Sequence, residues 1–202
     1  TIFELEGEAG DLGGLHAFSR DEVYVVARAR IWRREGSRFA AYDPGTWRDL
    51  YAITGTSPRD LWLGGQGGTI LHWDGTAFTR TTTPTEGTIV EIVLGGPRDA
   101  WARTRREYRA PGAPALLHWD GARWAAVDAP QDAAGVIAIA TRGGRTLALT
   151  DGGLCERDGS GWRSVVRSPE LGGDRYTPQR VCMTRAHAIV GLSGGILAHH
   201  TM

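Results

Sequence analysis

The stretch Ser57-Pro-Arg-Asp-Leu-Trp-Leu-Gly-Gly65, followed by Thr69-Ile-Leu-His-Trp-Asp-Gly-Thr-Ala-Phe78, decides the fold. It returns as Gly96-Pro-Arg-Asp-Ala-Trp-Ala102 and Ala115-Leu-Leu-His-Trp-Asp-Gly-Ala-Arg-Trp124. The His-Trp-Asp-Gly tetrad recurs in the same apolar frame, so the chain contains internal repeats.

Three weaker copies keep this frame and begin near Ser19, Arg145 and Ala186. A short apolar run precedes each of the five copies, for example Val90-Glu-Ile-Val93 before the third. The pattern predicts repeats at approximately 15–46, 48–87, 88–133, 134–176 and 177–202, the last completed by residues 1–6.

Each repeat reads as four short strands: an apolar run, a run centred on Trp or Tyr, an Ile-Leu run, and a run led by Phe or Trp. Asp-Gly between the last two runs is typical of a tight hairpin turn. No stretch sustains the 3.6-residue apolar period of a helix. Five such repeats predict an all-β, five-bladed β-propeller with four antiparallel strands per blade, forming a single domain over residues 1–202.

The fifth repeat stops before its aromatic residue, whereas the chain begins Thr1-Ile-Phe-Glu-Leu-Glu6. Phe3 fits the repeat position of Phe39, Phe78, Trp124 and Trp162. We therefore expect the N-terminal strand to pair with the strand near 195–200, which would complete the last blade and remove two exposed edges. The alternative is a piece of a larger ring with six to eight blades.

Composition narrows the function classes. The 202 residues carry 23 basic and 23 acidic side chains, so the formal net charge is zero and no general attraction to nucleic acid is expected. No apolar run has the roughly 18 residues of a membrane span. Cys155 and Cys182 form neither a disulfide framework nor a metal motif, and both are expected to be buried free thiols. No cofactor is predicted.

The Gly-x-Ile-Leu-His-Trp-Asp-Gly-x-x-Trp pattern at 67–78 and 115–124 resembles that of bacterial propellers with BNR-like (Asp-box-like) repeats and of photosystem assembly-factor propellers. In this chain the Asp directly precedes the Gly, whereas an Asp-box spaces them by one residue, which weakens a link to sialidase-type enzymes. The resemblance implies the fold and an exported or cell-surface location in a bacterium. It implies no particular chemistry.

Recurrent polar positions are interpreted as structural. His72, His118 and His199 share one repeat position with Glu156 and Arg33, and we expect hydrogen bonding between blades rather than metal binding. Asp74, Asp120 and Asp158, with Glu35, precede turn glycines, where a carboxylate accepts backbone N–H groups. Glu91 is the one acid within an inner-strand run, so paired catalytic carboxylates are not expected.

The segment 103–114 stands out because it inserts four Arg and one Tyr between the second and third strands of the third repeat. A second insertion, 167–179, joins the fourth and fifth repeats. Both kinds of connection open on one face of a propeller, and Arg with Tyr is typical of interface hot spots. A solvated insertion is the alternative. The predicted binding residues are Arg103, Arg105, Arg106, Tyr108, Arg109, Arg175 and Tyr176.

The sequence therefore predicts a non-enzymatic module that binds a protein partner through loops on one face. The alternative is a lectin-like propeller with glycan sites between blades. Third is a glycoside hydrolase-like enzyme that uses Glu91 at the central channel.

Overall fold

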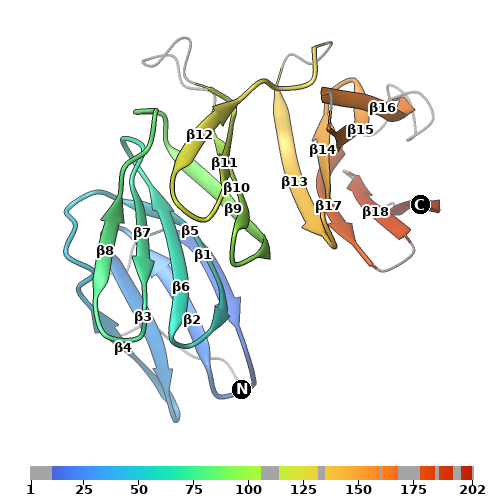
Figure 1. Ribbon diagram of the computed structural model, residues 1–202. Coiled ribbons are helices and arrows are strands. Elements are labelled where there is room, and N and C mark those ends of the chain that lie inside the picture. The colour runs from blue at the N-terminus through green and yellow to red at the C-terminus, as the bar shows by residue number, and fades with distance from the viewer. Residues whose placement is uncertain are drawn as a thin grey trace. The chain divides into compact units, whose positions relative to one another are not determined.

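The computed structural model describes residues 11–105, 114–131, 135–159, 161–167, 178–184, 187–192 and 197–201, and only the backbone of 178, 192 and 197–201. These residues form five antiparallel sheets with strands in sequence order (Figure 1). The first sheet contains β1 (Leu12–Ala17), β2 (Val23–Ala27), β3 (Arg30–Glu35) and β4 (Arg38–Tyr42). The second contains β5 (Leu50–Ser57), β6 (Asp60–Gly65), β7 (Ile70–Trp73) and β8 (Phe78–Thr81).

The remaining sheets follow the same plan. The third contains β9 (Ile89–Gly96), β10 (Asp99–Thr104), β11 (Leu116–Trp119) and β12 (Trp124–Val127). The fourth contains β13 (Val136–Arg142), β14 (Arg145–Thr150), β15 (Gly153–Asp158) and β16 (Gly161–Arg167). The fifth has three strands among the described residues, β17 (Pro178–Met183), β18 (His187–Leu192) and β19 (Leu197–Thr201).

The predicted all-β class is confirmed, and in the described part of the chain four sheets have the predicted four antiparallel strands. The chain divides into two compact units between Ile92 and Val93. The first unit holds the first two sheets, and the second holds β10 onward. The segment 1–6, which was expected to close the last sheet, lies outside the described residues.

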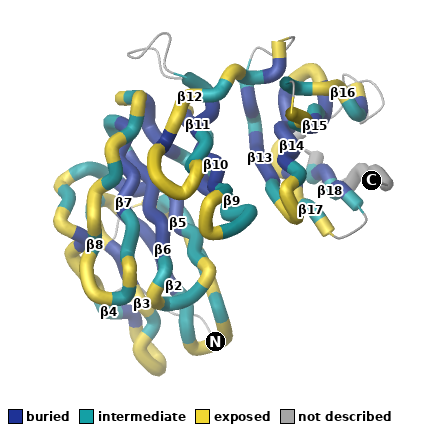
Figure 2. The backbone as a smooth tube through the Cα atoms, in the orientation of Figure 1, coloured by how far each residue is buried: buried dark blue, intermediate teal, exposed yellow. Residues whose placement is uncertain are grey.

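The second strand of each of the first four sheets is its most buried strand (Figure 2). In β6 every residue after Asp60 is buried, and in β14 every residue after Arg145 is buried. Such strands pack on both faces, which explains their apolar composition. The last strands, β4, β8, β12 and β16, are more exposed.

The Asp-Gly turns form as the sequence predicted. Asp74 Oδ1 accepts the backbone N–H groups of Thr76 and Ala77 at 2.8 and 2.9 Å. Asp120 Oδ1 accepts two backbone N–H groups in the equivalent turn at the same two distances. Gly75 and Gly121 have φ of +93° and +98°, a backbone conformation that favours glycine. These carboxylates are therefore structural.

The histidines at the recurrent position bond to an aspartate of their own sheet, which corrects the expectation of bonds between blades. His72 Nε2 lies 2.7 Å from Asp60 Oδ1, and the His72 ring stacks on Trp62 with centroids 4.2 Å apart. In the third sheet His118 Nε2 lies 3.0 Å from Asp99 Oδ1. The pair joins neighbouring strands, because the histidine on the third strand lies opposite Trp62 or Trp101 on the second.

In the fourth sheet the acidic and basic members of this pair change places. Arg145 takes the Asp position, and its Nε donates to Glu156 Oε1 at 2.6 Å. Arg163 Nη2 donates to Glu156 Oε2 at 2.7 Å. These bonds, with that from Arg145 the largest cause, lower the pKa of the mostly buried Glu156 carboxyl.

Neither cysteine forms a disulfide, and the expectation that both are buried is wrong. Cys155 is partly exposed and Cys182 is exposed. In each strand the preceding residue, Leu154 or Val181, is buried, so the cysteine side chain points to the opposite and more exposed face.

Candidate binding surfaces

The connection from the first to the second sheet, residues 43–49, is held by its own hydrogen bonds. Asp43 Oδ1 accepts the N–H of Gly45 at 2.8 Å, and Thr46 Oγ1 accepts that of Arg48 at 3.1 Å. At its far end, Asp49 Oδ2 accepts a bond from Gln66 Nε2 at 3.2 Å. The connection is thus braced by internal bonds and is tied at Asp49 to the turn that follows β6.

This connection presents Trp47, which is 80% exposed and is the most exposed of the large hydrophobic residues in the described part of the chain. The Arg48 guanidinium lies 4.7 Å from the centroid of the indole, within the range of a cation–π contact. Arg48 also lies against the backbone of Gly67, where any Cβ would meet Arg48 Nη1 at 1.8 Å. The indole therefore contacts a guanidinium that is itself packed against the backbone of the 66–68 turn.

The turn 66–68 between β6 and β7 lies between two inter-sheet connections of the first unit. The N–H of Gln66 donates to Asp49 O at 2.9 Å, and the N–H of Gly68 donates to Gly87 O at 3.0 Å. The strand-two-to-strand-three turn therefore opens on the same side as the connections 43–49 and 82–88. This confirms for the second sheet the placement that the sequence predicted for such segments.

Two of the seven predicted binding residues lie in the described part of the chain. Arg103 belongs to β10 rather than to a loop, and its Nη1 donates to Val136 O at 3.5 Å. The insertion therefore begins at Arg105, which is exposed. Thr104 closes its base by bonding to the backbone oxygens of Pro114 and Ala115. The other five residues, Arg106, Tyr108, Arg109, Arg175 and Tyr176, lie outside the described residues.

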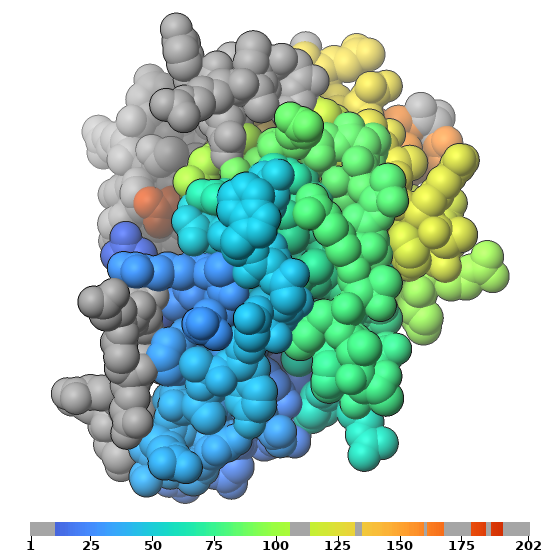
Figure 3. Space-filling view, turned by 90° about the vertical axis from the view of Figure 1, so that its left-hand side faces the viewer, coloured from blue at the N-terminus to red at the C-terminus, as the bar shows by residue number. Residues whose placement is uncertain are grey.

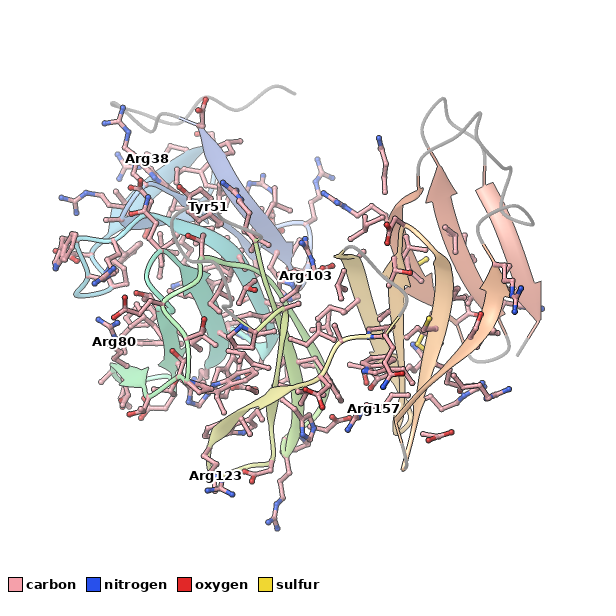
Figure 4. The ribbon with its side chains drawn as sticks, turned by 90° about the horizontal axis from the view of Figure 1, so that it is seen from above. Arg38, Tyr51, Arg80, Arg103, Arg123 and Arg157 are labelled. Carbon is pink, nitrogen blue, oxygen red and sulfur yellow. The ribbon has the colours of Figure 1, made fainter. Side chains whose placement is uncertain are left out.

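The second unit contains a groove of about 850 Å³ between the third and fourth sheets. One wall is formed by the end of β12 and the connection after it, from Ala126 to Gln131. The other wall is formed by Cys155, Arg157, Trp162 and further residues of the fourth sheet. Figure 4 shows Arg157 between the fourth sheet and β12. We call this site the β12–β16 groove.

Paired positions on β15 and β16 line the groove. Cys155 lies opposite Ser164, and Arg157 lies opposite Trp162. Trp162 Nε1 donates to Asp128 O at 2.6 Å, which fixes the indole across the two sheets. The Arg157 guanidinium lies 5.5 Å from the Trp101 centroid and 5.6 Å from that of Trp162.

Other kinds of site find no support in the described residues. Within them, no three His, Cys, Asp or Glu side chains are placed to hold one metal ion. The described chain contains no helix long and apolar enough to cross a membrane. Glu91 lies on β9, half-buried.

Sequence reasoning missed both Trp47 and the groove. Trp47 stands outside the repeat, in a connection with no motif to draw attention to it. The groove could have been found by aligning the copies, because Cys155 and Arg157 replace Leu117 and Trp119 of the third copy.

No known family profile and no curated protein matches the sequence significantly. Solved structures do match its fold. An inactive H270A virginiamycin B lyase from Staphylococcus aureus, solved with quinupristin, has a TM-score of 0.68 and 16% identity over 98% of this chain and 72% of its own. YCF48 bound to D1 peptide has a TM-score of 0.64 and 13% identity over 96% of this chain. The WD40 β-propeller domain of Doa1 has a TM-score of 0.72 and 13% identity over 98% of this chain.

The chain spans only 64% of YCF48 and 67% of the Doa1 domain. At these identities the likeness concerns the fold alone. Together with the antiparallel four-stranded sheets, it shows that the chain has the architecture of a β-propeller protein.

Proposed function

We propose that this chain is a non-enzymatic binding module that recognises a protein partner. The observation that carries the proposal is Trp47, an 80% exposed indole on a hydrogen-bonded connection. Burying a side chain of this size contributes about 1.5–3 kcal/mol. An exposed Trp forgoes that stabilisation in the free protein and recovers it on binding.

Fixed geometry strengthens the proposal. Binding is weakened by the conformational entropy of every flexible side chain that becomes immobilised in the complex. Trp47 is braced by Arg48, and Arg48 lies against the 66–68 turn, so little further ordering is needed. Trp and Arg are also the residue types enriched at interface hot spots.

The insertions 103–114 and 167–179 are proposed to extend the same surface. The first insertion joins the second and third strands of a sheet, and the second insertion joins two sheets. Connections of these two kinds lie side by side around Gln66. The contributing residues would be Arg105, Arg106, Tyr108, Arg109, Arg175 and Tyr176, with Arg103 at the base of the first insertion. YCF48, which shares the fold, was solved with a bound D1 peptide, and this supports a peptide or protein as the ligand class.

The test compares Trp47→Ala with Glu86→Ala. Glu86 is exposed and occupies the equivalent place in the equally long connection 82–88, so it is a matched control. Partners are captured from a bacterial lysate with the wild-type chain, purified, and titrated by calorimetry against each variant. We expect Trp47→Ala to weaken binding by about 30-fold or more and Glu86→Ala by less than about threefold.

A third variant replaces 105–114 by the Gln66-Gly-Gly68 turn of the second sheet. If this swap alone abolishes binding, the insertion is the interface and Trp47 is not. If a purified partner binds all three variants as it binds the wild type, the proposed surface is wrong.

We further propose that residues 1–202 form one five-bladed ring, closed by residues 1–6 pairing with β19. The repeat register supports this, because Phe3 matches Phe78 and His199 matches His72. Since His72 pairs with Thr79, the register predicts that Glu4 faces His199. A Glu4→Cys, His199→Cys chain without Cys155 and Cys182 should form an intramolecular disulfide. Failure to form it under oxidation, with Glu4→Cys, Leu192→Cys as the comparison, would refute the closure.

A further inference from the structure

The β12–β16 groove shares only Arg167, the first residue of the 167–179 insertion, with the proposed protein interface, and its lining points to a different ligand. We infer that it binds acidic saccharides, meaning short oligosaccharides that carry carboxylate groups. The inference rests on three features of the described residues: two guanidinium groups, one fixed indole, and a wall of small polar side chains.

The charges favour an anion. Arg157 and Arg167 both line the groove, and Asp128 is the one carboxylate among its described lining residues. Within the described part of the chain, neither arginine forms an ion pair with a carboxylate. Arg34, at the position of Arg157 in the first sheet, instead pairs with Asp21 at 3.2 Å. The guanidinium of Arg157 is therefore available to a carboxylate from outside.

The indole favours a sugar ring. Trp162 is only partly buried, and its N–H is already bonded to Asp128 O, so the ring is held in one orientation. A fixed aromatic surface next to guanidinium groups suits a ligand that combines C–H-rich ring faces with charged substituents.

The rest of the lining favours many hydroxyl groups over apolar side chains. Ser164 and Gln131 supply a hydroxyl and an amide group, and Asp128 supplies acceptors for sugar hydroxyls. An acidic peptide would need several apolar anchor pockets, whereas the apolar contribution here, apart from the Trp162 indole, comes from Pro130, Val127 and alanines. The volume of about 850 Å³ suits a short oligosaccharide better than a single ion.

The first experiment measures binding by calorimetry with three carboxylated probes: trigalacturonate, sialyllactose and a hyaluronan tetrasaccharide. Their methyl esters keep the rings and remove the charge. We expect at least one acid to bind and its ester to bind about tenfold more weakly or worse. If no acid binds, or if acid and ester bind equally, the inference is wrong.

The second experiment locates the site with the two thiols of the chain. Cys155 is among the described lining residues of the groove and Cys182 is not, yet both are thiols and at least partly exposed. A ligand in the groove should slow maleimide alkylation of Cys155 and leave that of Cys182 unchanged, as read by peptide mass spectrometry. Equal rates with and without a bound probe would place the ligand elsewhere and overturn the assignment.

The variants separate charge from general effects. Arg157→Ala should weaken the acid about tenfold or more and should hardly change binding of the ester. Arg80→Ala is the control, because Arg80 is an exposed arginine at the repeat position of Ser164 in the second sheet. Urea unfolding of each variant checks that the fold persists.

Two controls separate saccharide binding in the groove from binding of a protein or peptide. Trp47→Ala should bind the saccharide as the wild type does, because it lies in the other unit. Triglutamate serves as the peptide probe, and if it binds more tightly than every saccharide acid, the ligand class is wrong.

Discussion

The first and second sheets pack against each other through large apolar side chains, whereas the third and fourth leave a groove between them. In the first pair, Leu71, Trp73 and Phe78 of the second sheet join a cluster with Tyr24 and Val26 of the first. In the view of Figure 3 the blue surface of the first sheet and the green surface of the second meet without a hollow. The same face of the fourth sheet lines 850 Å³ of open space.

Two repeat positions that line the groove account for the difference. The second sheet has Leu71 and Trp73, where the fourth has Cys155 and Arg157. The first replacement shortens the side chain, and the second replaces an indole with a guanidinium. A shared inner layer, which includes Trp101 and Ile139, still holds the third and fourth sheets together.

Because the sheets repeat, the residue at one position of a sheet can be compared with the residue at the same position of another sheet. A residue that is the same in every copy of the repeat is explained by packing. Several replacements on one face of a sheet are not explained in this way when all of them are polar. Random loss of packing would lower stability but would not favour polar or charged residues on one face.

The largest expected effect is at Leu71, which is 3% exposed within the packed interface. Leu71→Ala should destabilise the chain by about 2–5 kcal/mol, because it leaves a cavity among close-packed neighbours. Cys155→Ala, at the same repeat position, should cost less than about 1 kcal/mol, since that side chain already borders open space. Urea unfolding measures the free energy of unfolding of both variants, provided that their m-values are equal. Equal losses of stability would show that the groove is packed in solution.

The charged pairs provide the next comparison. Glu156, 8% exposed, accepts bonds from Arg145 and Arg163, so Glu156→Gln should cost about 1–3 kcal/mol. The lowered pKa of Glu156 sets the sign: its contribution is present above the ordinary carboxyl pKa and is lost as pH falls through the folded value. The stability gap between wild type and variant should therefore close in acid. A gap that is constant with pH would contradict the ionic role.

Refilling the groove should have a smaller and opposite effect. Cys155→Leu with Arg157→Trp restores the residues of the third sheet and should stabilise the chain by about 1 kcal/mol through apolar burial. The same variant should lose binding of the acidic probes. Thermal unfolding and calorimetry give the two readouts. A variant that is less stable yet still binds would show that the groove does not follow from these two positions.

Much of the fold could be predicted because the same pattern of strands and turns recurs five times in the sequence. The strand positions follow from the apolar runs, and the Asp-Gly turns at Asp74 and Asp120 have almost the same hydrogen bonds. The histidine partners could not be assigned, because Asp60 and His72 are twelve residues apart and a periodic pattern does not show which strands face each other. Trp47 and the groove were missed since exposure is set by tertiary neighbours, which one copy of a connection or strand does not reveal.

The smallest effect is expected in the turn of the second sheet. Asp74 is fully exposed, and the hydroxyl of Thr76 together with two backbone N–H groups lowers its pKa from 3.8 to about 2. The folded pKa is the lower one, so the contribution is present above pH 3.8 and is lost as pH falls toward 2. Asp74→Asn should therefore lower the melting temperature slightly at pH 7 and by progressively less below pH 3.8. Asp120→Asn should follow the same course, because its pKa is lowered by the same two backbone bonds. A deficit that persists unchanged at pH 2 would mean that the turn depends on side-chain shape and not on charge, and the same interpretation would then apply to both sheets.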